Sequence, residues 1–415
     1  MRDRTTQYDV MVIGGGASGM MAAGRAAARG RRVLLLEKNR QLGEKLKITG
    51  GGRCNLTNAQ ASERLFLAHY GSAAPFLYSP FAQFGVKDTF SFFETRGLPL
   101  VIQAGQRVFP RTEKALDVFR VLEADLKKGK VEIRSDTAVS AMIGAEGRIE
   151  KVIAGQKEFF AASYIVATGG TSHPETGSTG DGLRWLKALG HSVQEPTPTI
   201  VPLAVSDAWI KALAGVSLPA VRITFRLNGK KQLTQNGRIL CTHFGLSGPV
   251  ILNAAKKVAD LLHAGAVTAG IDLYPGLDLG SLDQHLIKLF DANKNKSLKT
   301  AFKLVVPAGT AQAIMPLLPA IDPETKVHSV TKEQRKQIVR VIKALPVTVT
   351  GLMGYDRAVI ADGGVSLKEI DAKTMRSRRY SNLFITGDLL HISRPSGGYS
   401  LQLCWTTGAV AGSHA

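Results

Sequence analysis

The segment that most constrains the fold runs from residue 10 to residue 37, where two apolar runs flank a glycine turn and an alanine-rich stretch. Residues 10–13 and 32–36 each predict a short buried strand. Between them, residues 17–29 predict a helix that ends at Gly30. The order strand, turn, helix, strand is that of a βαβ unit, the repeating element of α/β folds.

The turn of this unit carries Gly14, Gly16 and Gly19 in the spacing G-x-G-x-x-G. In such turns the first glycine permits the bend, the second lets the backbone approach a pyrophosphate, and the third packs the helix against the strand. The unpaired N–H groups at the helix N-terminus then face the phosphates. Glu37 ends the second strand, where its carboxylate can accept hydrogen bonds from ribose hydroxyls. The pattern predicts binding of a dinucleotide, FAD or NAD, rather than a turn that only connects packed elements.

A second glycine-rich segment, residues 43–59, reads GEKLKITGGGRCNLTNA. Its backbone can wrap a phosphate or a flat ring, and Lys45 and Arg53 can neutralise phosphate charge. The alternative is an ordinary surface loop. Cys54 has no partner cysteine nearby, so we expect it to be buried and unreactive rather than a redox thiol.

Residues 164–167 predict another short strand, which runs into Thr168, Gly169 and Gly170 and offers a second place for ligand contact. The loop that follows contains His173, a candidate proton donor or a simple turn residue. Residues 182–189 then predict a helix with Asp181 as its N-cap.

Near the end of the chain, residues 383–385 predict a strand followed by Gly387 and Asp388, and a helix begins near residue 400 after a Gly-Gly pair. In this arrangement Asp388 can hold a ribityl hydroxyl, while the helix N–H groups face the pyrimidine edge of a flavin. The first domain is therefore expected to resume here.

Between these parts the composition changes at residues 195–203, EPTPTIVPL, whose prolines predict an extended crossing to another domain. Alternating apolar and polar residues at 221–227, followed by Asn-Gly pairs at 228–229 and 236–237, predict hairpins. Farther on, Pro249 at a first helical position and a capping box formed by Thr331 and Gln334 predict helices. We therefore expect a mixed β and α insertion at residues 195–347.

Charge and cysteine content limit the partners and the compartment. The 415 residues carry a formal net charge of +20, which can attract nucleic acid, anionic membranes or acidic substrates, but the basic residues are scattered, as on an ordinary soluble surface. Cys54, Cys241 and Cys404 form no C-x-x-C pair, which favours a reducing, cytoplasmic setting without a metal site. The apolar run before the first glycine is too short for a signal peptide or a membrane span.

These motifs resemble those of the BaiN-like, aminoacetone-oxidase-like FAD-binding flavoproteins, a family of NAD(P)/FAD-dependent oxidoreductases. The resemblance extends over nearly the whole chain and rests on VIGGGASG (12–19), GGGRCNLTN (50–58), ATGGTSHPETGSTGDG (167–182), THFGLSGP (242–249), GGVSLKEID (363–371) and GGYSLQ (397–402).

The resemblance implies an α/β fold, with a glutathione-reductase-like FAD-binding Rossmann domain interrupted by a mixed β-barrel and helical insertion domain. The FAD-binding domain would then comprise residues 1–194 and 348–415. Within the insertion, the barrel part would cover about 195–275 and the helical part about 276–347.

The resemblance also implies the cofactor contacts. The ADP half of FAD would lie against the first glycine turn, the pyrophosphate or flavin near the second glycine segment, and the ribityl chain and ring near the last strand and helix. The implied FAD-binding residues are Gly14, Gly16, Ala17, Ser18, Gly19, Glu37, Lys38, Lys45, Gly52, Arg53, Cys54, Asn55, Val139, Thr168, Gly169, Gly170, Gly387, Asp388, Gly398, Tyr399 and Leu401.

Two stretches differ from the family pattern. His173 stands where relatives usually carry tyrosine, Asp388 replaces a glutamate, and His391 with Arg394 makes basic a loop that is often acidic. His391 and Arg394 lie between the predicted ribityl contact and the flavin-facing helix, so we take them as candidates for substrate contact. His173 remains a third candidate for a catalytic role.

The sequence thus predicts an FAD-dependent oxidoreductase with a small-molecule substrate. It contains no second G-x-G-x-x-G, so NAD(P)H, where it is the donor, would bind transiently; a small organic substrate is the other source of electrons. A flavoprotein that modifies RNA and a non-catalytic flavin-binding redox module stay open as alternatives. Nucleic acid is the less favoured partner, and the oligomeric state is left open.

Overall fold

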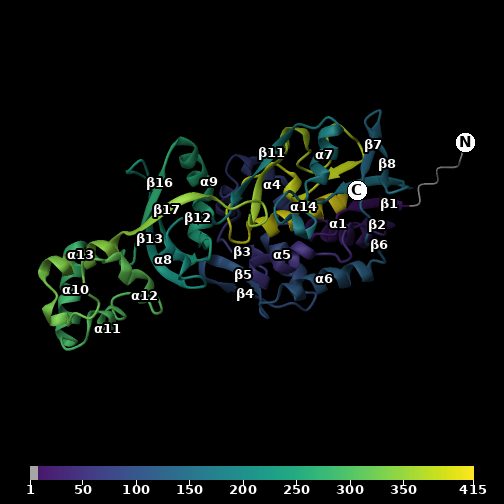
Figure 1. Cartoon of the computed structure of the whole chain (residues 1–415). Coiled ribbons are helices and arrows are strands. Elements are labelled where there is room, and N and C mark those ends of the chain that lie inside the picture. The colour runs from purple at the N-terminus through teal and green to yellow at the C-terminus, as the bar shows by residue number, and fades with distance from the viewer. Residues whose placement is uncertain (1–7) are drawn as a thin grey trace, which may run out of the picture. The chain divides into compact units, whose positions relative to one another are not determined.

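The computed structural model describes residues 8–415 (Figure 1). Two compact units make up the chain: one is formed by the chain up to Pro198 together with Ala361–Ala415, and the other by Thr199–Ile360. Strand β11 (Val193–Ile200) leads out of the first unit and strand β18 (Ile360–Val365) leads back. The domain limits expected from the sequence stay a prediction; their start lies outside the described residues, and residue 347 falls within strand β17 (Leu345–Leu352).

A parallel sheet of five strands forms the centre of the first unit. Each strand pairs in parallel with its neighbours, so the carboxyl ends of the strands share one edge. The strand order is β19 (Leu383–Ile385), β10 (Ala161–Val166), β1 (Tyr8–Ile13), β2 (Val33–Leu36) and β6 (Glu132–Arg134). The apolar runs predicted as strands at 10–13, 32–36, 164–167 and 383–385 all belong to this sheet.

Two helices that begin at this edge pack closely against each other, α1 (Ala17–Ala28) and α14 (Tyr399–His414). Figure 1 shows the purple α1 beside the yellow α14. Gly408 and Gly412 lie one helical turn apart on α14. In α1, a Cβ on Gly408 would overlap the carbonyl oxygen of Ser18, and a Cβ on Gly412 would overlap that of Ala22. The missing side chains therefore allow two backbones far apart in sequence to touch.

The rest of the first unit surrounds this centre. Its further helices are α2 (Glu44–Ile48), α3 (Glu63–Ala68), α4 (Ala74–Gln83), α5 (Val86–Glu94), α6 (Ala115–Lys128) and α7 (Asp181–Ala188). Its two small antiparallel sheets consist of β3 (Thr57–Asn58), β5 (Arg107–Pro110) and β4 (Leu100–Gln103), and of β7 (Ala141–Ala145), β8 (Arg148–Ala154) and β9 (Lys157–Phe159).

The second unit contains a closed barrel with its own apolar core. Its strands, in order around the barrel, are β12 (Leu203–Val205), β15 (Gly245–Ser247), β14 (Lys230–Cys241), β13 (Ser217–Leu227), β16 (Val267–Asp272) and β17. Its helices are α8 (Ala208–Lys211), α9 (Pro249–Ala264), α10 (Leu279–Ala292), α11 (Leu298–Phe302), α12 (Ala311–Ile314) and α13 (Lys332–Lys343). The mixed barrel and helical composition expected from the resemblance is present.

Local signals in this unit had different outcomes. Asn228 and Gly229 both have positive φ and join β13 to β14 as a hairpin, and the capping box of Thr331 and Gln334 begins α13 as predicted. The second Asn-Gly signal was wrong, because Gly237 lies inside β14, where the pairing with β13 shifts register. Gly237 has a φ of +140°, and a Cβ there would lie 2.8 Å from the Val250 side chain. The position therefore requires glycine although the chain continues as a strand.

Among residues 8–415, no helix combines the length and the apolar character needed to cross a bilayer. The same residues contain no cluster of three or more histidine, cysteine, aspartate or glutamate side chains arranged to hold a metal ion.

Candidate functional site

The three glycines of the first turn have two different physical roles. Gly14 has a φ of +103°, and a Cβ there would lie 2.6 Å from the carbonyl oxygen of Ala167, which follows β10. A Cβ on Gly19 would overlap the carbonyl oxygen of Gly14. Around Gly16, in contrast, a Cβ would meet no protein atom within 4 Å. Packing therefore explains the first and third glycines, whereas the second borders open space, as close approach of a pyrophosphate requires.

Glu37 is fixed beside this turn. Its carboxylate is buried, with 8% of the residue exposed, and accepts hydrogen bonds from the backbone N–H of Gly15 at 2.7 Å and of Asn39 at 2.8 Å. Each oxygen keeps lone-pair capacity for a further donor such as a ribose hydroxyl. The backbone N–H of Thr137 also donates to the Glu37 carbonyl at 2.9 Å, which brings the loop carrying Val139 alongside.

The N-termini of α1 and α14 both offer free backbone N–H groups. The N-cap residues are Gly16 and Gly398, neither helix has a side-chain cap, and neither has an acid in its first turn. Gly398 has a φ of +101°, and a Cβ there would overlap the backbone of Thr57. The indole Nε1 of Trp405 in α14 donates to the carbonyl of Leu56 at 3.0 Å. The second glycine segment and the start of α14 are therefore neighbours.

Within that segment, Gly50, Gly51 and Gly52 all have positive φ, and a Cβ on Gly51 or Gly52 would meet no atom within 4 Å. Cys54 is fully buried with a φ of +59°. Burial raises the pKa of its thiol to about 12, so the side chain is a neutral thiol. This agrees with the unreactive packing role expected from the sequence.

Arg53 makes its contacts on the surface side of the segment. Its guanidinium donates to the carboxylate of Glu113 at 2.5 Å and to the amide oxygen of Gln103 at 2.7 Å, and it lies 4.4 Å from the centroid of the Phe109 ring. The carboxylate of Glu113 therefore neutralises the charge that was expected to face a phosphate, and Glu113 lies too far from Arg53 in the sequence to be predicted as its partner.

Five buried side-chain oxygens near these loops have no hydrogen-bond partner among residues 8–415. They are Oδ1 of Asn55, Oγ1 of Thr57, Oδ1 of Asn58, Oγ1 of Thr168 and Oγ1 of Thr171. A buried polar group left unpaired costs about 1–3 kcal/mol, so a polar ligand that supplies partners is favoured there. Hydroxyl, amide and backbone groups around glycine turns match the donors and acceptors of FAD, so these residues fit the cofactor.

A charged cluster centred on Asp388 lies beside Gly170. Its carboxylate is paired with Arg394 and lies 3.4 Å from the ammonium of Lys45, which also donates to the hydroxyl of Ser172 at 2.5 Å. Burial alone would raise the pKa of Asp388, but the two cations together lower it. Asp388 is thus a carboxylate at neutral pH, and it lies against Gly170.

The three catalytic candidates occupy different environments. The Arg394 side chain is only 1% exposed and also donates to the carbonyl of Ile392 at 2.6 Å, so it positions Asp388 from inside the protein. His391 is exposed. His173 has a left-handed φ of +56°, and its Nδ1 lies 2.7 Å from the carboxylate of Glu175. This partner stands two residues from His173 in the motif HPE, so the sequence contained a signal for it.

Lys38 and Asp181 form an ion pair of 2.8 Å. Although burial opposes the shift, hydrogen bonds from Lys38 and Thr179 lower the pKa of Asp181. The prediction that Asp181 caps α7 was wrong: Gly180, with a φ of +75°, is the N-cap, and Asp181 is the first helical residue. Its carboxylate is used to hold Lys38 rather than a backbone N–H group.

The structure therefore brings most of the predicted cofactor residues to one edge of the parallel sheet. Gly14 meets the backbone of Thr168, Gly387 meets Ser18, and Gly398 meets Thr57. A Rossmann sheet with two open glycine turns and two uncapped helix N-termini at its carboxyl edge defines a flavoprotein that binds FAD, an FAD-dependent oxidoreductase.

The chain belongs to the HI0933-like family, because the HI0933-like protein Rossmann domain matches residues 8–414. It is 30% identical over 412 residues to the 3-dehydro-bile acid Δ4,6-reductase of Clostridium scindens, with 97% of each chain covered. It is 28% identical over 409 residues to a ribosomal RNA dihydrouridine synthase of Haemophilus influenzae, again with 97% of each covered. The family, the fold and the FAD-dependent oxidoreductase class predicted from the sequence are confirmed.

Solved structures support the same fold. The 3-ketosteroid-Δ4-(5α)-dehydrogenase of Rhodococcus jostii has a TM-score of 0.53 at 15% identity, and the match covers 100% of this chain and 98% of that one. At this identity the likeness concerns the fold alone.

Proposed function

We propose that the protein is an FAD-dependent reductase that saturates a carbon–carbon double bond conjugated to a carbonyl group. Three relatives that each match 97% of the chain carry names that describe the reduction of such bonds: one is a 3-dehydro-bile acid Δ4,6-reductase, and two are ribosomal RNA dihydrouridine synthases. A carbonyl withdraws electrons from the double bond, so its far carbon accepts a hydride. The shared chemistry supports the reaction class more strongly than either substrate.

The structural observation that supports the FAD part of this proposal is the set of unpaired buried oxygens around the two glycine turns, which fits a tightly bound FAD. We propose the contacts named from the resemblance as the FAD-binding residues. When bound, FAD supplies a hydride to one carbon of the double bond, while a proton completes the other carbon. The N-terminus of α14 favours negative charge near the flavin because its N–H groups are uncapped.

The surroundings of Asp388 and His173 suggest which of the two side chains donates the proton in the proposed reaction. Asp388 is kept ionised by Arg394 and Lys45, so it acts as an acceptor for a hydroxyl and not as the acid. We propose His173 as the proton donor, because the Glu175 carboxylate at its Nδ1 holds the ring orientation and the doubly protonated ring can give its Nε2 proton to the substrate, which leaves the neutral ring. His391 remains the candidate for substrate contact.

The electron donor in this proposal is NAD(P)H, bound transiently, because the sequence has one G-x-G-x-x-G and it lies at the FAD edge of the sheet. The three cysteines are all free, which supports a reducing compartment such as the cytoplasm. We also retain residues 1–194 and 348–415 as the FAD-binding domain and 195–347 as the insertion.

An anaerobic flavin titration tests the proposal. The purified protein should show a flavin spectrum that NADH or NADPH bleaches, and a conjugated enone or a uridine-containing RNA should then restore the oxidised spectrum. The saturated analogue of the same compound is the matched control and should leave the flavin reduced. Reoxidation by molecular oxygen alone, with none by any conjugated acceptor, would contradict the reductase assignment.

The charge distribution favours RNA as the second candidate substrate class. Residues 199–360 contain 20 lysines and arginines against 10 aspartates and glutamates, so this unit carries half of the +20 excess in well under half of the chain. A small bile-acid-like substrate gives no reason for such an excess.

A further inference from the structure

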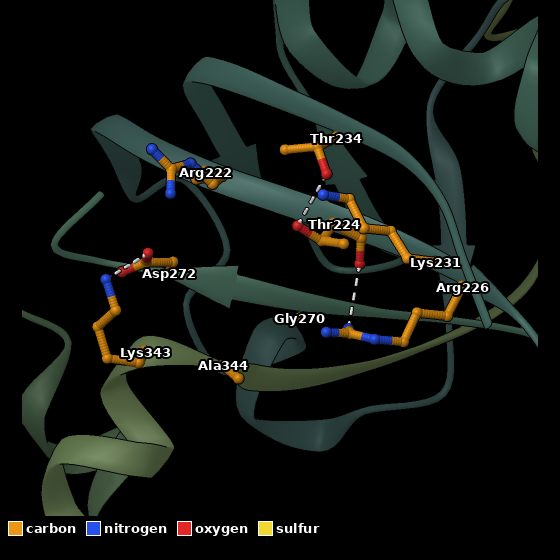
Figure 2. A pocket seen from close by; sticks show the side chains of 9 residues that line it. All are labelled: Arg222, Thr224, Arg226, Lys231, Thr234, Gly270, Asp272, Lys343 and Ala344. Atoms are coloured by element: carbon orange, nitrogen blue, oxygen red, sulfur yellow. Dashed lines mark hydrogen bonds and ion pairs between the residues drawn. The ribbon is translucent and has the colours of Figure 1, made fainter. Parts of the chain in front are cut away.

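A basic pocket of about 360 Å³ lies on the barrel of the second unit, and none of the residues that line it is assigned to FAD. Figure 2 shows side chains of β13, β14 and β16 and the end of α13 around it. Its charged lining consists of Arg222, Arg226, Lys231, Lys343 and a single carboxylate, Asp272. Four cations around one acid leave the pocket strongly positive.

The strand pattern explains how this pocket forms. Ile223 and Phe225 of β13 are fully buried in the barrel core, so the alternating residues Arg222, Thr224 and Arg226 lie on the outer face. Thr224 pairs with Thr234 of β14 on one side and with Gly270 of β16 on the other. Because Gly270 has no side chain, the wall is hollow there. A Cβ at this position would lie 3.3 Å from Nη1 of Arg226.

The four cations are not equally available to a ligand. Lys343 pairs with Asp272 at 2.7 Å and donates to the carbonyls of Tyr274 and Leu277, so its charge is used within the protein. The Arg222 guanidinium donates to Asn236 at 3.1 Å and to the carbonyl of Pro275 at 3.0 Å.

Arg226 and Lys231, in contrast, are almost free. Arg226 makes one long hydrogen bond of 3.5 Å, to the carbonyl of Thr224. Across the part of the chain that the structure describes, the Lys231 ammonium makes no hydrogen bond or ion pair, and this residue is exposed. Thr224 and Thr234 line the pocket as well (Figure 2), and because their hydroxyls lie 3.2 Å apart and share one hydrogen bond, one O–H of the pair remains as a further donor.

We propose that this pocket binds a phosphate group of an RNA strand. A guanidinium fork, an ammonium and hydroxyl donors around a hollow are the groups that recognise phosphate oxygens, and such contacts to the backbone position a strand without reading its sequence. The lining has too many charges for an apolar ligand. As a docking point for the substrate of the reductase the pocket rests on the proposed function, whereas phosphate binding does not.

Fluorescence anisotropy of a labelled single-stranded RNA of about twelve nucleotides, titrated with the full-length FAD-loaded protein, tests this site. The double variant Arg226→Ala/Lys231→Ala should bind at least about tenfold more weakly, because two charge-assisted contacts are lost. The slope of log affinity against log salt should decrease by about 0.7 for each phosphate contact removed. Inorganic phosphate at high concentration should compete with the RNA in the wild-type protein and much less in the variant.

The matched control is Lys288→Ala, which removes an exposed charge from α10 of the same unit, outside the pocket. It should change affinity far less than the double variant, and both variants should keep the flavin spectrum and melting temperature of the wild type. Equal RNA binding by the double variant and the control would overturn the site, as would a wild-type protein that binds inorganic phosphate there but no RNA. Turnover of conjugated acceptors, measured on the same samples, separates the two ideas: RNA binding without turnover contradicts the reductase, and turnover with pocket-independent RNA binding contradicts the pocket.

Discussion

Replacing Gly16 by alanine separates the role of the first glycine turn in binding from its role in folding. Gly16 has φ −78° and ψ −171°, a conformation that alanine adopts without strain. The new methyl group would meet no protein atom within 4 Å. Any effect of the substitution must therefore come from what occupies the open space beside the N-terminus of α1.

Two opposing contributions set the expected stability of the variant without FAD. Alanine restricts the unfolded chain more than glycine does, which stabilises the native state by about 0.4–1 kcal/mol. Alanine is also a poorer N-cap residue than glycine by roughly the same amount. The free energy of unfolding should therefore stay within about 1 kcal/mol of the wild-type value.

The affinity for FAD should decrease much more. A methyl group at this position keeps the pyrophosphate from its backbone N–H donors, and a hydrogen bond to a charged group contributes about 1.5–3 kcal/mol. Loss of one such bond corresponds to an increase in Kd of about 10- to 150-fold. Urea unfolding of the apoprotein and titration with FAD, followed by quenching of flavin fluorescence, measure the two quantities separately.

Gly19→Ala is the contrasting variant, because its methyl group would overlap the Gly14 carbonyl oxygen. Helix propensity favours alanine by about 1 kcal/mol, but the enforced backbone shift costs about 1–3 kcal/mol or more, so the apoprotein should be less stable. Wild-type FAD affinity in Gly16→Ala would refute the reasoning that the second glycine faces the pyrophosphate.

Three further outcomes follow from the hydrogen bonds and the burial of individual side chains. Glu37→Gln should lower the stability of the apoprotein by about 1–3 kcal/mol, because the amide NH₂ faces one of two backbone N–H groups that now donate to the carboxylate; equal melting temperatures would contradict this. Cys54 and Cys241 are fully buried, and burial raises the pKa of their thiols to about 12 and about 11, so Ellman's reagent at pH 8 should label neither of these two until guanidinium unfolds the protein. Burial alone would raise the pKa of Glu369, but hydrogen bonds from Arg379 and Ser192 lower it to about 2. The ionised Glu369 carboxylate stabilises the fold by about 2 kcal/mol after allowance for solvent screening. This contribution is present above about pH 4.3 and is lost as the pH falls towards 2. The free energy of unfolding, measured with urea, should therefore decrease less steeply with falling pH in Glu369→Gln than in the wild type.

The sequence predicted the elements whose signals are local. The apolar runs of β1, β2, β10 and β19, the glycine turn and the capping box of Thr331 depend on neighbours within a few residues. The predictions that were wrong involve positions where distant packing decides. Gly237 looked like a turn because Asn precedes it, yet Val250 on α9 fills the space that requires glycine.

The candidate site shows the same division. The roles of Gly14, Gly16 and Glu37 could be predicted because they occupy fixed places in a βαβ unit. The partners of the charged residues could not, because Arg394 reaches Asp388 across a loop and Lys45 reaches it from the second glycine segment, 343 residues earlier in the chain. Only the fold shows that Arg394 is an interior residue.

One packing contact connects the two halves of the predicted FAD site. Helices α1 and α14 begin at the two uncapped N-termini, and Gly408 and Gly412 allow α14 to lie against the backbone of α1 at Ser18 and Ala22. Ser18 also donates to the hydroxyl of Thr386, just after β19, at 2.5 Å. Since both helices are locked to each other and to the strand before Asp388, the distance between the two N-termini is set by the protein core. A cofactor that bridges them therefore binds a prearranged site, which reduces the ordering cost of binding.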